Sequence, residues 1–239
     1  MINNSLSQLI RRDLAILYRI VSYLNLDDHT YTHLSTKSSS EESYFILPFG
    51  LRFEEITEDN LIEIGLDAKV RSKDDAKYNK TGYVIHSQIY KNRKDVNSII
   101  HVHSPEIVAV SSIKEGLMPI SQWALHFYNK ISYHEYNSLI LDVDNEDLIK
   151  DLGQNNILML RNHGIIICGK TIHEALFYLY HMQIACKTQI LTLSQNRELV
   201  IPSVSIAEKS VQDLLSFEQD LGKRDWDAWV RVLERKNIL

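Results

Sequence analysis

Two short stretches, each continuing an apolar run, constrain the fold of this chain most. Residues 97–105 read NSIIHVHSP and residues 157–164 read ILMLRNHG. Alternate side chains of a β-strand share one face, so His101 and His103 are expected to point the same way, about 7 Å apart. The second run indicates a buried strand that could deliver His163 to the same place. Three neutral imidazoles around an open position are a common way to hold a catalytic divalent metal.

The ordinary alternative is that each histidine is a structural residue satisfied by hydrogen bonds. For any single one of the ten histidines this alternative is the better interpretation. The pair at positions i and i+2 differs, because it lies at a strand end directly before Ser104 and Pro105, which favour a helix start as N-cap and first helical residue. Ligating groups concentrate at such strand ends, and the pair therefore favours a metal site.

Strand and helix alternate through the rest of the chain. Helical spacing or capping predicts helices over 8–25, 83–93, 120–129, 145–153 and 171–193, and two more after Pro202. Strand patterns predict a hairpin over 31–50, a strand pair over 61–70, and strands over 97–103, 131–133 and 157–168. With no repeat and no clear linker, this order indicates one α/β domain over residues 1–195, followed by a helical C-terminal extension over 196–239.

Composition excludes several classes of protein. Of the 239 residues, 44% are hydrophobic and 24% charged, with only 8 Gly and 4 Pro, which is typical of a soluble globular protein. The net charge of −5 carries no basic block, so neither nucleic acid nor a membrane is an expected partner. Cys168 and Cys186 form no CxxC motif, and the charged first helix is not a signal peptide. We therefore expect a cytoplasmic protein.

Several ordered motifs resemble one family. Beyond the HVHSP and RNHG stretches, they are LPFG at 47–50, NKTGYVIHS at 79–87, GLMPISQ at 116–122, YHEY at 133–136, Gly169, and Glu174-Ala175. Together they resemble the class II aldolase/adducin head-domain family from about residue 10 to about residue 195, closest to its adducin-like branch. The resemblance implies a three-layer fold with a central, largely antiparallel or mixed β-sheet flanked by helices.

The resemblance also implies a chemistry. In the aldolase members the three histidines that match His101, His103 and His163 bind a divalent metal, usually zinc. That metal acts as a Lewis acid on the oxygens of a small carbonyl substrate during carbon–carbon bond cleavage. The family further implies a homo-oligomer, often a tetramer, with metal sites near the subunit boundaries.

The chain departs from these enzymes at the residues that would complete the site. Their catalytic Glu lies four residues before the position of His86, where this chain has Gly82. Their phosphate-binding residues, small hydroxyl side chains and a Gly-Asn pair, are replaced here by Phe49-Gly50 and Thr32-His33. Lys80 and His33 remain candidates for substrate binding, but the pocket is not predicted to suit a sugar phosphate. His86 fits the site and the core equally well.

Three hypotheses follow. The first is a divergent metal-dependent lyase for a small carbohydrate-like carbonyl compound, whose acid–base residue would come from the candidates Tyr133, His134, Glu135 and His126. For each of these four, a surface or supporting role is the more common alternative. The second is a non-catalytic, adducin-like oligomeric binding module, suggested by Gly82. The third is an epimerase or decarboxylase of a sugar acid that uses similar enolate chemistry.

Overall fold

The computed structural model describes residues 2–72, 76–137 and 146–239. Its helices are α1 (Ile2–Tyr23), η1 (Phe53–Glu55), α2 (Lys80–Asn92), α3 (Pro105–Ser111), α4 (Gln122–Leu125), α5 (Glu146–Leu152), α6 (Ile172–Leu193), α7 (Val204–Phe217) and α8 (Lys223–Arg235). Its strands are β1 (His33–Lys37), β2 (Ser43–Ile46), β3 (Ile62–Gly65), β4 (Ser98–Val102), β5 (Ile131–His134), β6 (Ile157–Leu160) and β7 (Gly164–Gly169).

The seven strands form one mixed sheet in the order β3-β2-β1-β4-β7-β6-β5. Every neighbouring pair is antiparallel except β5 and β6, which are parallel. β4 lies in the middle, with His101 opposite His33 of β1 on one side and opposite Ile166 of β7 on the other. The largely antiparallel or mixed sheet expected from the sequence is confirmed.

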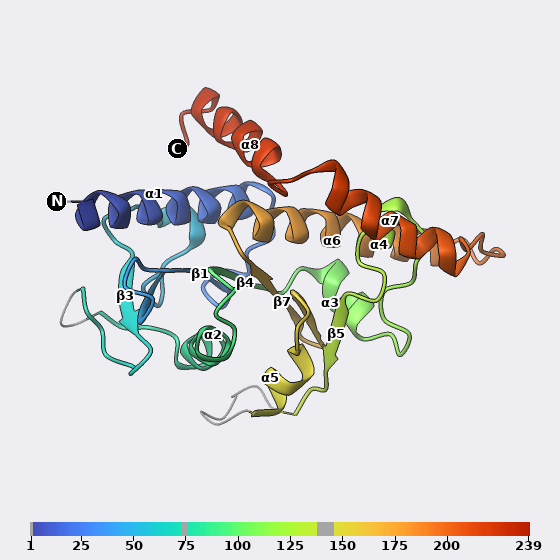
Figure 1. Cartoon of the computed structure of the whole chain (residues 1–239), viewed down its shortest axis with the longest axis horizontal. Helices are drawn as coiled ribbons and strands as arrows, with labels where there is room; N and C mark the ends of the chain where they lie inside the picture. The colour runs from blue at the N-terminus through green and yellow to red at the C-terminus, as the bar shows by residue number, and fades with distance from the viewer. Residues whose placement is uncertain (1, 73–75, 138–145) are drawn as a thin grey trace.

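Helices cover both faces of the sheet. Figure 1 shows α1 and α6 along one face and α2 and α5 on the other, with α7 and α8 outside the first helical layer. All residues of β4, β6 and β7 are buried, as expected for central strands covered on both faces. The fold therefore has the three layers that the resemblance implied.

Local chemistry explains where the main elements begin and end. Thr171 accepts a hydrogen bond from the Glu174 amide at the start of α6, and Asn79 accepts from two amides at the start of α2. The helix expected over 120–129 is shorter than predicted: α4 is a single turn, and Asn129 has a left-handed φ of 56° that stops helical winding. The strand pair expected over 61–70 reduces to β3 and one isolated bridge.

The C-terminal residues fold back onto the domain. α7 packs on α4, and α8 packs on α6 and α1. The division into a domain over 1–195 and an extension over 196–239 stays a prediction. Among the helices that the structure describes, none has both the length and the apolar character needed to cross a lipid bilayer.

Arg93 provides a test of how α2 and α5 are held together. Its guanidinium is 5% exposed and donates to the carbonyls of Gly153 and Asn155, both at 2.8 Å, and to the Asp95 carboxylate. We expect Arg93→Ala to lower the free energy of unfolding by about 1–3 kcal/mol, because two backbone carbonyls and the Asp95 carboxylate lose the donors of a buried guanidinium. Urea denaturation measures this, and the half-exposed Arg52, changed to Ala, should cost less than about 1 kcal/mol. Equal losses of unfolding free energy in Arg93→Ala and Arg52→Ala would show that the buried hydrogen bonds of Arg93 do not stabilise the fold.

Candidate metal centre

His101, His103 and His163 meet at one end of β4. Their ring centroids are 4.7 to 5.1 Å apart, and one nitrogen from each ring lies within 4.8 Å of the others. His101 is the second-last residue of β4, and His103 directly follows the last residue of that strand. His163 comes from the turn between β6 and β7. In the described part of the chain, this is the one group of three or more His, Cys, Asp or Glu side chains close enough to share a metal ion.

The β6–β7 turn is shaped to bring His163 close to β4. Asn162 adopts a φ of 58°, a left-handed conformation that asparagine tolerates better than most residues, and the His163 amide donates to the Leu160 carbonyl. A Cβ on Gly164 would lie 2.5 Å from the carbonyl oxygen of Val102 and 3.0 Å from the His103 ring. The Asn-His-Gly order therefore has a steric cause: only glycine lets the turn approach the end of β4 so closely.

Hydrogen bonds orient the two histidines of β4. Nδ1 of His101 lies 2.9 Å from the carbonyl oxygen of Ile165, and Nδ1 of His103 lies 3.0 Å from the Asp28 carboxylate. Both partners are acceptors, so both Nδ1 atoms carry a proton, and in a neutral ring the lone pair is then on Nε2. These two Nε2 atoms are 2.9 Å apart. Such facing lone pairs repel unless a proton or a cation lies between them, and a nitrogen held this way is the usual metal-ligating form of histidine.

Burial favours the neutral form of His101 and His163, which is the form that a metal requires. Burial, and next the neighbouring His103, lowers the pKa of His101 well below its ordinary value. The same two causes lower the pKa of His163 to about 4. The donor set, three neutral imidazoles on rigid elements, suits a zinc-like divalent cation better than a hard ion that prefers oxygen ligands.

A second pair of histidines lies behind His101. His33 is directly opposite it across the β1–β4 pairing, with the two ring centroids 4.9 Å apart. Nδ1 of His33 is 2.7 Å from Nε2 of His86, a residue of α2. His86 also bonds Ser35, whose hydroxyl is 2.8 Å from the Tyr90 hydroxyl. Burial lowers the pKa of His86 to about 3. The sequence left open whether His86 faces the site or the core. In the structure it is a buried residue that hydrogen-bonds His33.

The described contacts of the four acid–base candidates are with residues other than the three histidines. Tyr133 accepts from the Leu117 amide beneath the Arg161 guanidinium, and its position in β5 directs it to the face opposite His134. His134 is buried and bonds Asp151 of α5 at 2.7 Å, while the Glu135 side chain is 84% exposed. Lys80, proposed for substrate binding, is an exposed residue at the start of α2.

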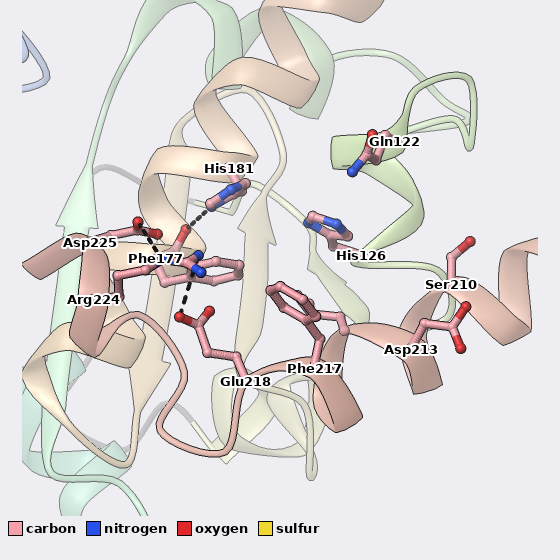
Figure 2. A pocket seen from close by; sticks show the side chains of 11 residues that line it. Gln122, His126, Phe177, His181, Ser210, Asp213, Phe217, Glu218, Arg224 and Asp225 are labelled. Atoms are coloured by element: carbon pink, nitrogen blue, oxygen red, sulfur yellow. Dashed lines mark hydrogen bonds and ion pairs between the residues drawn. The ribbon is translucent and has the colours of Figure 1, made fainter.

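His126 lies in a separate cavity. Figure 2 shows it beside His181 and Phe177 of α6 and opposite Phe217 of α7. The cavity measures about 530 Å³, and the ring of His126 is 5.5 Å from that of His181. Burial lowers the pKa of His126 to about 4. The structure thus places this candidate among the C-terminal helices, away from the three histidines of β4 and the β6–β7 turn.

Sequence reasoning missed two residues that contact the three histidines. Asp28, in the loop before β1, bonds His103. Tyr136, which is 49% exposed, places its ring 6.2 Å from that of His163 in an edge-on orientation. The YHEY motif was itself a signal for Tyr136, but the alternation of β5 could not tell which of its residues would reach the site. Nothing in the local sequence marks Asp28.

Comparison with known proteins identifies the family. The family model for the Class II Aldolase and Adducin N-terminal domain matches residues 12–190. This chain belongs to the class II aldolase and adducin family. The crystal structure of an aldolase II superfamily protein from Pseudomonas syringae has a TM-score of 0.90 and 34% identity, covering 98% of this chain and 95% of that one.

Two further comparisons are with an adducin and with an aldolase. Rat (Rattus norvegicus) alpha-adducin is 36% identical over 192 residues, which cover 78% of this chain and 26% of the adducin. An L-fuculose 1-phosphate aldolase from Glaciozyma antarctica PI12 has a TM-score of 0.84 and 24% identity, covering 95% of this chain and 89% of that one. At this identity the second likeness shows the shared fold alone. The membership expected from the sequence motifs is confirmed.

The contact between Asp28 and His103 predicts an effect on metal affinity. Asp28→Asn removes the negative charge that holds the Nδ1 proton of His103, so we expect Co²⁺ to bind about 10–100-fold more weakly. Titration followed by visible absorption measures the dissociation constant. Asp27→Asn is the matched control, because that carboxylate pairs with Arg52 rather than with a histidine. Unchanged affinity in Asp28→Asn would show that this contact does not orient the ligand.

The neutral histidines also predict acid sensitivity. Six imidazoles have a pKa lowered chiefly by burial, namely those of His33, His86, His101, His126, His163 and His181. Their folded pKa lies below the unfolded value of about 6.5, so between pH 7 and pH 5 the unfolded chain binds more protons. The stability that they contribute is complete above about pH 6.5 and is lost as the pH falls.

Urea denaturation of the metal-free protein at pH 7 and pH 5 tests this sign. His86 alone should account for about 1–2 kcal/mol of the decrease, so the difference between the two pH values should shrink by that amount in His86→Phe. Most carboxylates stay ionised in this range, which isolates the histidines. The same pH difference in the variant and the parent would contradict the buried neutral state of His86.

Proposed function

We propose that this chain is a divergent metal-dependent class II aldolase-like carbon–carbon lyase for a small, carbohydrate-like carbonyl compound. His101, His103 and His163 would be the ligands of a divalent cation, with zinc the best match to three imidazoles. The observation that carries the proposal is the 2.9 Å distance between Nε2 of His101 and Nε2 of His103. In both rings the other nitrogen, Nδ1, donates its proton to an acceptor of the protein.

Residues around the three histidines have defined roles in this chemistry. A divalent cation held here would supply Lewis-acid polarisation of the substrate carbonyl. The Ile165 carbonyl and Asp28 fix two of the imidazole rings, so the ligands need little rearrangement. The half-exposed ring of Tyr136 lies next to the ring of His163. Its phenolic hydroxyl could exchange a proton with a bound substrate. Roles for Tyr133, His134, Glu135 and His126 stay predictions.

Gly82 favours a second candidate function. The position has no carboxylate, and with Gly82 the chain lacks the base that the aldolase members use there. A non-catalytic, adducin-like oligomeric binding module would keep the fold and need no base. An epimerase or decarboxylase of a sugar acid would keep both the metal ligands and the enolate chemistry.

A homo-oligomer is part of either proposal. α7 and the segment before it present exposed apolar side chains, those of Val200, Ile201, Val204, Ile206, Leu215 and Phe217. Exposed apolar groups that are close in sequence are typical of surfaces that pack on another chain. Light scattering of the purified chain measures the assembly directly, and a tetramer is the state that the family resemblance favours.

Metal analysis of the purified protein and of two variants tests the proposed function. We expect about one equivalent of zinc or a similar divalent metal per chain, and a loss of at least tenfold in affinity in His103→Ala, because one of three ligands is removed. His173→Ala is the control, since that histidine lies at the start of α6 and contacts Asp220. Metal content that is absent, or unaffected by His103→Ala, would rule out the site.

Activity then separates the two functions. A screen of aldehydes with dihydroxyacetone, and of ketoses for cleavage, should show turnover that chelators abolish and added metal restores. Turnover that is lost in His103→Ala supports the lyase. A metal-loaded protein with no turnover on these compounds favours the binding module.

A further inference from the structure

His33 occupies the space beside the metal centre that a side chain at position 82 would need. A Cβ on Gly82 would lie 2.8 Å from Cδ2 and 2.9 Å from Nε2 of the His33 ring, closer than real Cβ contacts come. The imidazole therefore stands in front of the first turn of α2, and position 82 has to be glycine while His33 stays there. The two residues form a matched pair.

The ring of His33 is fixed by a buried chain of polar side chains. Its Nδ1 bonds His86, which bonds Ser35, and the Ser35 hydroxyl bonds Tyr90. All four side chains are at most 2% exposed. This line of hydrogen bonds uses Nδ1 of His33 in either tautomer of the ring, so Nε2 is the polar atom of His33 that is left over. No hydrogen-bond partner of this atom lies in the described part of the chain.

The surroundings of Nε2 offer little to an anion. In the first turn of α2, the amides of Thr81 and Gly82 both donate to the Asn79 side chain, at 3.0 and 3.3 Å, and are already satisfied. The described ion pairs and cation–ring contacts include none to His33 or Gly82. A phosphate placed here would lose its hydration and meet a buried imidazole and a bare glycine.

We propose that Nε2 of His33 hydrogen-bonds a hydroxyl group of the substrate, and that the site takes an unphosphorylated polyhydroxy carbonyl compound. This inference rests on the proposed function, because it assumes that the substrate is held at the neighbouring three histidines. A hydroxyl group both donates and accepts, so it pairs with Nε2 in either tautomer of the ring. A phosphate oxygen only accepts, and its charge would be buried against His33 and Gly82, to which no described ion pair or cation–ring contact brings a cation.

Two metal-chelating probes test the inference on the Co²⁺-loaded protein. Glycolohydroxamate ends in a hydroxyl group, and phosphoglycolohydroxamate carries a phosphate at the same place. Visible absorption of Co²⁺ reports the binding of each. We expect the parent protein to bind glycolohydroxamate at least tenfold more tightly, a comparison that needs no variant. Tighter binding of the phosphate probe would overturn the inference.

Variants of His33 give a second, independent readout. His33→Ala should weaken glycolohydroxamate binding about tenfold while the Co²⁺ dissociation constant changes less than threefold. His33→Gln, whose amide both donates and accepts, should recover part of the loss. His173→Ala removes an imidazole at the start of α6 that contacts Asp220, and it should leave both constants unchanged. Equal binding of glycolohydroxamate by His33→Ala and the parent would overturn the inference.

The failures of the two proposals are distinguishable. If Co²⁺ does not bind the parent protein, the metal centre itself is wrong and the substrate inference falls with it. If Co²⁺ binds and is lost in His103→Ala, but the hydroxyl probe shows no preference and no dependence on His33, only the substrate inference is overturned.

Discussion

The pairing of β4 on both sides is the constraint on which the site depends. β1 and β7 hold β4 through antiparallel ladders, and the register sets His101 against His33 on one side and Ile166 on the other. The same arrangement supplies the Ile165 carbonyl that accepts the Nδ1 proton of His101. Because the ladder is rigid and buried, the imidazoles are positioned before any ligand arrives, and little ordering entropy remains to be lost on binding.

A line of buried polar side chains lies beside this pairing, and its hydrogen bonds explain the positions of these side chains. The line from His33 through His86 and Ser35 to Tyr90 crosses from the sheet to α2 within the apolar core. A half-satisfied network of this kind would cost more than an apolar core, because buried polar atoms without partners lose their hydration. Nε2 of His33 is the end of this line without a described partner and lies against Gly82, which is why we propose a ligand for it.

Family membership and chemistry have different support here. The motifs at the strand end and the β6–β7 turn follow from steric needs, such as the close approach at Gly164, and identify the fold. Position 82 carries chemistry in the enzymes, and this chain has glycine there because His33 fills the space. The close contact between His33 and Gly82 indicates that the site was altered at both positions together, rather than by the loss of one catalytic residue.

Sequence alone determined the strand ends, the Asn-His-Gly turn and the shared face of His101 and His103, because these depend on local periodicity and on glycine and asparagine conformations. It also determined the family. Only the tertiary structure decided that Asp28 holds His103, that Tyr136 rather than its neighbours in the YHEY motif borders His163, and that His33 stands against Gly82. These contacts join residues from 27 to 75 positions apart, and their distances depend on how the layers pack, which no local pattern encodes.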